Sequence, residues 1–412
     1  MSDLDRVRVG VIGYGRRAPA IIRSLLFMDD VDVVAVCDLV EDRCNNAAKQ
    51  IFDAKGFLPD KYSDYRDIID RKDIDAVIAC TSWLTHIQIA IDSMNAGKYV
   101  AIEVGGAYSI NQCWQLVHTY ERTRVPCMLL ENVCYGRNEL ALLNMVKKGI
   151  FGELVHMEGG YSHYIGDAMV IRIPDNYYRH PNYLHRNCDN YPTHGLGPSY
   201  YMLNINRGNR LLSLVSVSSK SVGMHEDSVR LLGADSEAAK WHWQCGDVIT
   251  TIIKTSHGET ITLTLDTVLP RPKSRKNYVQ GTKGIYMDDG KQIYIEGMSP
   301  ESHTWDSFEP YLQKYEHPLW KWYLEAGVRG GHSGIDYLTE RAFIESVKNR
   351  TQTPIDVYDT ATMMSITVMS EESIAKGSEM VVIPDFTSGY WMERKPMVQS
   401  RFSLDGIYPE LF

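Results

Sequence analysis

The sequence predicts an α/β protein with two domains. Over the first 130 residues, runs of strand type alternate with amphipathic runs, which is typical of a doubly wound parallel sheet. Between residues 150 and 300, strand-type runs follow one another with few helices, which indicates an α+β domain with a largely antiparallel open sheet. At 412 residues, the chain also exceeds the size of a single core. We expect a first domain at 1–130, a second at 131–376 and a C-terminal arm at 377–412.

Composition excludes several classes of protein. Hydrophobic residues at 44% and charged residues at 23% are ordinary globular values. The net charge of −9 argues against a nucleic-acid or anionic-membrane partner, although the basic run 271–276 suits either one small anionic group or a solvated loop. No apolar run is long enough to span a bilayer, and no export signal precedes the first strand. Eight cysteines without a Cys-x-x-Cys pair favour reduced, buried thiols and a cytoplasmic protein.

The elements of the first domain follow in βα order. We expect strands at 7–12, 32–37, 76–80, 99–103 and 126–130, and helices at 19–27, 85–96 and 110–122. The first strand leads through a glycine turn, 13–18, into the first helix. Gly13 permits the turn, Gly15 lets a pyrophosphate approach the backbone, and the helix N-terminus favours the anion. This pattern predicts a dinucleotide-binding Rossmann domain.

The second strand ends at an acidic residue that bears on the choice of cofactor. Asp38 lies about 20 residues beyond the glycine turn, where a carboxylate can accept hydrogen bonds from an adenosine ribose. A 2′-phosphate beside it would be repelled, so we expect NAD rather than NADP. Arg43 is the nearby feature that would suit NADP.

Two further segments leave the carboxyl ends of predicted strands, where ligands of such sheets bind. They are the loop 81–86 and the tripeptide 103–105. Trp83 suits a place near the nicotinamide riboside, whereas His86 is equally explained as a residue at the start of a helix.

The second domain is predicted from its strands. We expect them at 154–161, 211–218, 248–254, 259–267, 277–281 and 292–296, with a clear helix at 137–148. The irregular segment 162–192 is long enough to be functional or mobile. Helical segments at 335–349 and 354–375 complete the core. The aromatic arm after Gly377 would pack on its own domain or on a sister subunit, which makes a homo-oligomer compatible with the sequence.

The stretch 191–198 carries the most distinctive chemistry of this domain. Two prolines and two glycines restrict the backbone around the phenol of Tyr191 and the imidazole of His194, which favours a rigid turn over a continuing helix. The alternative is a turn followed by a helix that the histidine merely caps. The glycine-rich segment 330–336 is similar: it belongs to a site, or forms the first turn of the next helix with Ser333 as its cap.

A cofactor domain beside tyrosines and histidines permits redox chemistry at an alcohol carbon. Hydride removal from an alcohol needs a group that takes the hydroxyl proton. The side chains of suitable type are Tyr161, His163, Tyr191 and His194, each of which could equally serve in packing. A zinc alternative built from His180, His185, Cys188 and His194 has spacings that match no ligand pattern, so no metal is expected.

The motifs of both predicted domains resemble those of known protein families. The first domain resembles the Gfo/Idh/MocA oxidoreductase superfamily, and the second is similar to glycoside hydrolase family 109. The motifs of the second resemblance are 131–132, 135–137, 152–156, 191–198, 204–208, 279–284 and 330–332. The resemblance implies an NAD-dependent glycosidase of the α-N-acetylgalactosaminidase type that recycles its cofactor.

The implied mechanism needs no pair of catalytic carboxylates. Oxidation of the sugar's 3-hydroxyl acidifies the hydrogen on carbon 2; a base removes that proton and the glycosidic oxygen leaves. Water then adds back and the hydride returns to carbon 3.

The resemblance also assigns residues. It places NAD on Gly13, Gly15, Arg16, Arg17, Asp38, Trp83, His86, Glu103, Val104 and Asn132. It places the carbohydrate substrate against Tyr161, Arg179, Tyr191 and His194, and we add Thr193 and Lys273 as further substrate-binding candidates. Tyr161 and His194 would form the acid/base pair, in an order left open, and Arg179 would orient a substrate oxygen.

Several positions depart from the patterns of these families. Sugar dehydrogenases commonly carry Glu-Lys-Pro where this chain has 103–105, and the missing lysine counts against a net sugar or inositol dehydrogenase. The hydrolases tend to have proline at Gly105, glycine at Ser333 and tyrosine at Lys273, and a longer segment at 162–192. A lysine at 273 would suit a carboxylate or sulfate on the sugar. A dehydrogenase and a non-catalytic NAD-binding sensor stay open as alternatives.

Overall fold

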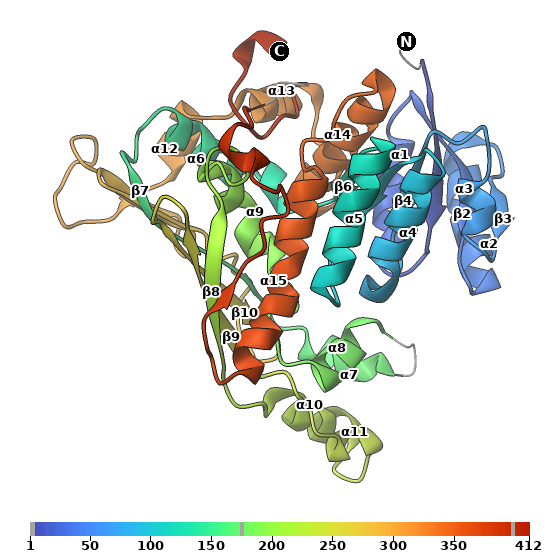
Figure 1. Ribbon diagram of the computed structural model, residues 1–412, viewed down its shortest axis with the longest axis horizontal. Helices are drawn as coiled ribbons and strands as arrows, with labels where there is room; N and C mark the ends of the chain where they lie inside the picture. Colours follow the sequence, from blue (N-terminus) through green and yellow to red (C-terminus); the bar gives the residue numbers. More distant parts are fainter. Residues whose placement is uncertain (1–4, 174–176, 397–399) are drawn as a thin grey trace. The chain divides into compact units, whose positions relative to one another are not determined.

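The computed structural model describes residues 5–173, 177–396 and 400–412, which group by their contacts into two compact units (Figure 1). Unit 1 combines 1–140, 316–361 and 396–412, and unit 2 combines 141–315 and 362–395. The boundaries predicted from the sequence put 316–361 in the second domain. In the structure this segment belongs to unit 1 because its long helix packs on the first helix of the chain. The domain boundaries at 130 and 376 therefore stay a prediction from the sequence.

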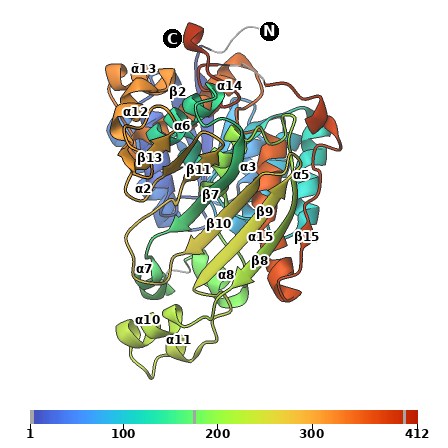
Figure 2. The same ribbon diagram turned by 90° about the vertical axis from the view of Figure 1, so that its left-hand side faces the viewer.

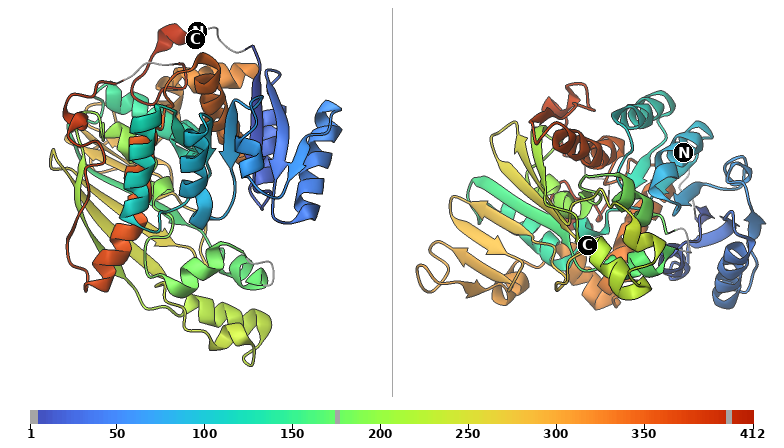
Figure 3. Two further views of the ribbon diagram at one scale, coloured as in Figure 1. Left: turned by 45° about the vertical axis from the view of Figure 1, so that its right-hand side comes forward. Right: turned by 90° about the horizontal axis from the view of Figure 1, so that it is seen from below.

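Unit 1 contains the predicted parallel sheet. All its strand pairs are parallel, in the order β3-β2-β1-β4-β5-β6, and its inner strands are apolar on both faces. Figure 3 shows these strands side by side in dark blue to cyan. The strands are β1 Val7–Ile12, β2 Val31–Cys37, β3 Asp60–Tyr62, β4 Ala76–Ala79, β5 Tyr99–Ile102 and β6 Cys127–Leu129.

The helices of unit 1 lie on both faces of this sheet. The strand order reverses direction beside β1, and right-handed crossovers then place the helices before and after that point on opposite faces. Helix α1 packs with α2 and α14, and α4 packs with α5. The helices are α1 Ala18–Leu26, α2 Glu41–Lys55, α3 Arg66–Ile69, α4 Trp83–Asn95, α5 Ile110–Thr123, α13 Pro318–Ala326 and α14 Ile335–Asn349, with 3₁₀ turns η1 Asn132–Tyr135, η3 His332–Gly334 and η5 Pro409–Leu411.

Unit 2 is built on a nine-stranded sheet in the order β14-β13-β12-β11-β7-β10-β9-β8-β15 (Figure 2). Its strand pairs are antiparallel except for β10 with β7, so the prediction of a largely antiparallel sheet is confirmed. Burial alternates along β9 and β10, as expected where one face is solvated. The strands are β7 Leu154–Ser162, β8 Leu211–Ser218, β9 Val248–Thr255, β10 Thr260–Asp266, β11 Tyr278–Gly281, β12 Gly284–Met287, β13 Gln292–Ile295, β14 Asp306–Ser307 and β15 Val381–Val382.

The helices of unit 2 correct two expectations. The segment 162–192 was expected to be irregular, but it contains α7 Gly166–Ile171 and α8 Arg179–His185. For the stretch 191–198, the favoured rigid turn is wrong and the alternative, a turn followed by a helix, agrees with the structure, because α9 Thr193–Met202 begins inside it. The other helices of this unit are α10 Gly223–Leu232, α11 Glu237–Lys240 and α12 Glu309–Lys314, while α6 Arg137–Lys147 and α15 Val357–Ala375 each run from one unit into the other and η4 Tyr390–Met392 follows β15.

The C-terminal arm packs on its own chain. Strand β15 pairs with β8, and Phe386 is buried in the same unit. In unit 1, Phe402 is buried and its carbonyl accepts a hydrogen bond from Tyr135 Oη at 2.9 Å. All eight cysteines are free and buried, as expected. No helix in the described ranges combines the length and apolar character needed to cross a bilayer.

Candidate cofactor and substrate sites

The glycine turn of unit 1 has the backbone that its sequence predicts. Gly13 has φ +89°, and an added Cβ would lie 2.9 Å from the Cys80 carbonyl, so a larger residue is excluded there. At Gly15 a Cβ would meet nothing within 4 Å, so the space beside its backbone is open. The N–H groups of Gly15 and Arg16 make no hydrogen bond within the described residues, and the first turn of α1 contains no acidic residue. Backbone donors at a helix N-terminus fit a pyrophosphate.

Asp38 closes this turn from the end of β2. Its carboxylate accepts hydrogen bonds from the Tyr14 N–H at 2.7 Å and from the Val40 N–H at 3.0 Å. The Arg43 guanidinium lies 3.8 Å from the same carboxylate, which is 8% exposed. The negative charge is therefore fixed beside the glycine turn by two loops of unit 1.

An ionic network joins the turn to helix α14. Arg17 donates to Glu103 at 2.8 Å and forms a two-pronged pair with Asp336 at 2.7 and 2.8 Å. Asp336 is buried, yet hydrogen bonds from His332 and Arg17 hold the pKa of its carboxyl well below the usual range. Burial raises the pKa of Glu103, an effect that the charge of Arg17 opposes. This network fixes the guanidinium of Arg17, whereas Arg16 is exposed.

The glycine-rich segment before α14 belongs to this network. Asn132 Nδ2 donates to Asp336 at 2.7 Å, and His332 Nδ1 lies 2.9 Å from the same carboxylate. The segment was interpreted either as part of a site or as the first turn of the next helix. It is a 3₁₀ turn that precedes the helix, and its histidine contacts the network. Ser333, expected as a helix cap, makes no side-chain cap bond and has φ +59°.

Trp83 and Val104 bring the other two loops together. Trp83 Nε1 donates to the Val104 carbonyl at 3.0 Å, and an added Cβ at Gly105 would lie 2.4 Å from the Trp83 ring. His86 is buried in α4 with Nε2 3.1 Å from the Thr81 carbonyl, and burial lowers its pKa to about 4. A histidine held neutral inside a helix start supports the local fold of the loop.

In unit 2, three glycines allow α9 to lie directly on β7. A Cβ at Gly159 would be 2.1 Å from the Gly195 carbonyl oxygen, and one at Gly195 would be 2.6 Å from the Gly160 nitrogen. Helix and strand therefore touch backbone to backbone. This close approach places His194, in the first turn of α9, beside Tyr161 of β7, with ring centroids 5.4 Å apart.

The remaining substrate-side candidates gather on the same rings. Tyr191 lies 4.3 Å from Tyr161 and 4.8 Å from His194 between ring centroids. The Arg179 guanidinium, from α8, lies 4.6 Å from the Tyr191 ring centre and 5.3 Å from that of Tyr161. Thr193 is buried at the start of α9, where its hydroxyl oxygen has no hydrogen-bond partner among the described residues. The structure thus brings these five predicted residues together.

Two residues of this cluster were missed or left unassigned. His163 lies 4.7 Å from Tyr161 between ring centroids, and burial and the charges of Arg179, Arg275 and Lys273 lower its pKa to about 4. The Arg275 guanidinium lies 5.5 Å from the Tyr161 ring centre. The basic run 271–276 was the available signal for Arg275, and alternation along β7 was the signal for His163.

The zinc alternative has no support in the described ranges, where no group of three or more His, Cys, Asp or Glu side chains is arranged to hold a metal ion. His180 instead packs against Trp241 and Trp243, at 5.0 and 5.3 Å between ring centroids. 

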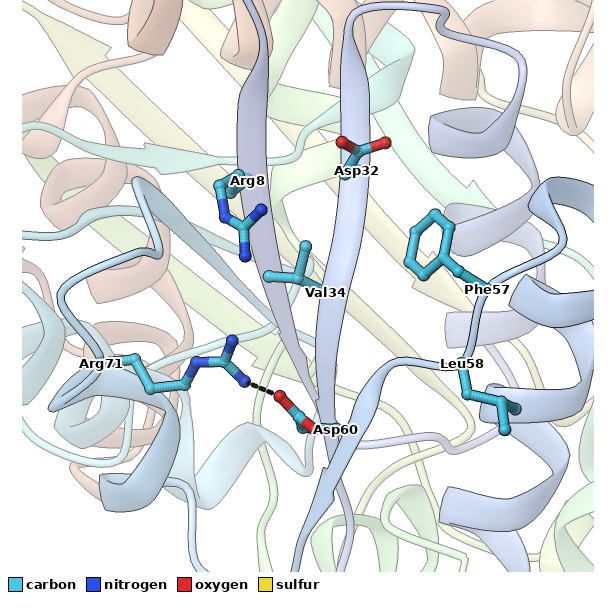
Figure 4. Close-up of a pocket in the computed structure, with 7 residues that line it drawn as sticks. All are labelled: Arg8, Asp32, Val34, Phe57, Leu58, Asp60 and Arg71. Carbon is cyan, nitrogen blue, oxygen red and sulfur yellow. Dashed lines mark hydrogen bonds and ion pairs between the residues drawn. The ribbon is translucent and has the colours of Figure 1, made fainter.

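A hollow of about 260 Å³ lies elsewhere in unit 1, beside the first halves of β1 and β2 (Figure 4). Its two arginines are already paired: Arg71 contacts Asp60 of the lining at 2.5 Å, and Arg8 contacts Asp73 outside it at 2.5 Å. Because the glycine turn leaves the carboxyl end of β1, this hollow is separate from the candidate cofactor site. It is lined by Arg8, Asp32, Val34, Phe57, Leu58, Asp60 and Arg71.

Two family models match the chain. Residues 7–130 match the oxidoreductase family with an NAD-binding Rossmann fold, and residues 135–393 match the C-terminal domain of glycosyl hydrolase 109. A glycosyl hydrolase family 109 protein of Stenotrophomonas maltophilia is 38% identical over 98% of this chain and 93% of its own length. A Tannerella forsythia protein named alpha-N-acetylgalactosaminidase is 37% identical over 95% of this chain and 88% of its own length.

Solved structures show the same fold at much lower identity. Levoglucosan dehydrogenase in complex with NADH has a TM-score of 0.68 and 16% identity over 92% of this chain and all of its own. A scyllo-inositol dehydrogenase from Lactobacillus casei has a TM-score of 0.64 and 13% identity over 93% of this chain and 99% of its own. The fold resemblance predicted from the sequence is confirmed. With its second domain matched by that family's model and nearly its whole length by curated relatives, the chain belongs to the glycosyl hydrolase 109 family.

Proposed function

We propose that this protein is an NAD-dependent glycosidase that acts by oxidation at carbon 3 of the sugar, elimination, addition of water and reduction. The observation that carries the proposal is the cluster of Tyr161, His194 and Arg179. It places two ionisable rings side by side and a guanidinium against one of them. Membership of the glycosyl hydrolase 109 family supports hydrolysis as the net reaction. The Rossmann domain binds a nicotinamide cofactor, and Asp38 supports NAD as that cofactor.

The cofactor residues would act as a preformed cradle. The open backbone at Gly15 suits the pyrophosphate, and the carboxylate of Asp38 suits the adenosine ribose. Arg17 is held by Glu103 and Asp336, so its charge stays fixed. When bound, the nicotinamide ring supplies an acceptor that takes a hydride and later returns it.

Tyr161 and His194 would handle the protons. One of them takes the 3-hydroxyl proton as the hydride leaves carbon 3, which gives a ketone. The C2–H bond is then acidic; a base takes this proton, the C1–O bond breaks, and the aglycone oxygen leaves with a proton from an acid. Water adds at C1 and a proton returns to C2, after which hydride and proton return to carbon 3 and its oxygen. Every atom taken from the sugar ring is restored, so the net change is hydrolysis.

Arg179 would orient a substrate oxygen and keep the acid/base rings in place. Its guanidinium is buried against the rings of Tyr161 and Tyr191. The cation is attracted to the electron-rich faces of these rings, and this contact holds them in position. The buried hydroxyl of Thr193 would be a further contact for the sugar.

Aryl glycosides in deuterated water test this mechanism. The first substrate to use is an aryl α-N-acetylgalactosaminide, since relatives from Tannerella forsythia and Shewanella oneidensis carry that name. We expect aglycone release with deuterium at carbon 2 of the product and no net NADH. Release without deuterium would refute elimination, and stoichiometric NADH with an oxidised sugar would establish a dehydrogenase instead.

Two variants with matched controls test the residues. His194→Ala and Tyr161→Phe should each lower kcat by about 10²- to 10⁴-fold, the usual contribution of an acid or base. His156→Ala and Tyr164→Phe remove the same groups at positions that bond instead to Thr260 and Asp227, and should retain activity. If the first pair retains activity as the controls do, Tyr161 and His194 are not the acid/base pair. If the wild-type protein binds NAD but cleaves none of the glycosides, it is a sensor rather than an enzyme.

A further inference from the structure

A short bridge brings the loop between β10 and β11 alongside the end of β7. Ser274 N donates to the Ser162 carbonyl at 2.7 Å, and Ser162 N donates to the Ser274 carbonyl at 3.3 Å. The pairing is antiparallel, so the residues flanking each serine lie opposite one another. Arg275 is thereby opposite Tyr161, and Lys273 is opposite His163.

Side chains alternate between the faces of paired strands, so these two cations share a face with the proposed acid/base tyrosine. The ring contacts agree with this register: the Arg275 guanidinium is 5.5 Å from the Tyr161 ring centre. Arg179 reaches the same ring from α8, at 5.3 Å. Three cations therefore surround Tyr161 and His163.

Lys273 and Arg275 differ from Arg271 of the same loop, which forms an ion pair with Asp266. In the described ranges, no carboxylate forms an ion pair with Lys273 or Arg275, and the ion pair of this loop is that of Arg271. Asp266, whose carbonyl accepts from the His163 N–H, is paired through its carboxylate with Arg271. Burial and the three cations lower the pKa of His163 to about 4. The imidazole therefore does not change the net charge beside Lys273 and Arg275 at neutral pH. Like charges held this close favour an anion among them.

We propose that Lys273 and Arg275 bind an anionic substituent of the sugar, a carboxylate or a sulfate ester, so that the preferred substrate is an acidic glycoside. This proposal rests on the proposed function and assigns its substrate class. The guanidinium of Arg275 can form two parallel hydrogen bonds to such a group, and the ammonium of Lys273 adds a mobile point charge. Arg179 serves the sugar ring itself, as proposed above.

Paired substrates measure the effect directly. The pairs are aryl α-galactoside with aryl α-galacturonide, and aryl N-acetylgalactosaminide with its 6-sulfate, so that the arms separate carboxylate from sulfate. We expect the acidic member of one pair to have a kcat/KM about 10- to 100-fold higher than its neutral partner, the gain expected from hydrogen bonds to a charged group. The advantage should shrink with added salt, because exposed charges are screened.

Lys273→Met and Arg275→Gln should remove this advantage, because they should raise KM for the acidic glycoside by a larger factor than KM for the neutral one. Lys283→Met, the same substitution outside the loop, should leave both substrates unchanged. Equal rates for neutral and acidic members, unaffected by either loop variant, would overturn the proposal.

A binding measurement separates this proposal from the proposed function. Methyl galacturonide and N-acetylgalactosamine 6-sulfate are titrated by calorimetry into the NAD-loaded protein and into the Lys273→Met variant. Tight binding that the variant loses supports the anion site even if no glycoside is cleaved. Glycoside cleavage without anion preference or anion binding supports the glycosidase and refutes the acidic substrate.

Discussion

The Asp38→Asn variant should bind NADP, because the charge that excludes a 2′-phosphate is lost while the turn is kept. The amide oxygen can still accept a hydrogen bond from the Tyr14 or Val40 N–H, which now lie 2.7 and 3.0 Å from the carboxylate. Two unit charges about 5 Å apart repel by about 3 kcal/mol at an effective dielectric constant of 20. The Arg43 guanidinium, 3.8 Å from the carboxylate, already offsets part of this repulsion. We therefore expect NADP to bind about 10- to 100-fold more tightly to the variant.

Calorimetric titration of the cofactor-free protein with NAD and with NADP, at one ionic strength, gives the ratio of the two Kd values. Asp42→Asn, the same substitution on the neighbouring helix, is the matched control and should leave the ratio unchanged. Adding Arg43→Leu to the Asp38 variant separates the two electrostatic contributions, since it removes the cation that a phosphate would contact. A ratio that stays within twofold of the wild-type value in Asp38→Asn would refute Asp38 as the determinant of cofactor choice.

Two further predictions concern stability. Burial raises the pKa of the Asp189 carboxyl to about 7, whereas an unfolded aspartate has a pKa near 3.9, so the folded state loses stability as pH rises between these values. The variant Asp189→Asn keeps an acceptor for the Tyr191 N–H. It should raise the unfolding free energy by up to about 4 kcal/mol at pH 8 and by much less at pH 5. Equal shifts of the thermal unfolding midpoint at both pH values would contradict this. Ser333→Gly should stabilise unit 1 by about 1 kcal/mol in thermal unfolding, because φ +59° strains any residue but glycine, and a lower midpoint would show that the serine side chain compensates.

Unit 1 could be predicted from the sequence because its signals are local. The strands that were predicted are short apolar runs, the predicted helices are amphipathic, and the glycine turn joins the first pair with a fixed spacing to Asp38, whereas the polar strand β3 and helices α2 and α3 were not predicted. The predicted ends agree with the structure within one or two residues, as for α1 Ala18–Leu26, expected at 19–27. Local signals could not predict the contact between the glycine turn and α14, because Arg17 and Asp336 lie far apart in the sequence and meet only in the folded protein.

Helices α7 and α8 were missed, and α9 was given only as an alternative, because tertiary packing overrides local preference there. Helix α9 contains two glycines and Pro198, which has no N–H to donate to the His194 carbonyl one turn earlier. Such a sequence is a poor helix in isolation. It is stabilised by burial along its whole length, and its Gly195 is needed where it touches Gly159 of β7. Helices α7 and α8, with six and seven residues, are too short for periodicity to reveal.

The substrate-side cations depend on a feature that no local pattern encodes, namely the register of Ser274 against Ser162. A shift of one residue would move Lys273 and Arg275 to the opposite face from Tyr161. The register is held by two backbone hydrogen bonds and by the length of the loop that leaves β10, in which two prolines restrict the backbone. Loop length and the residues beside Ser274 can therefore change the charge presented to the sugar without altering the acid/base pair. On this reasoning, a change in the length of this loop should alter the proposed substrate preference while leaving the rings of β7 and α9 in place.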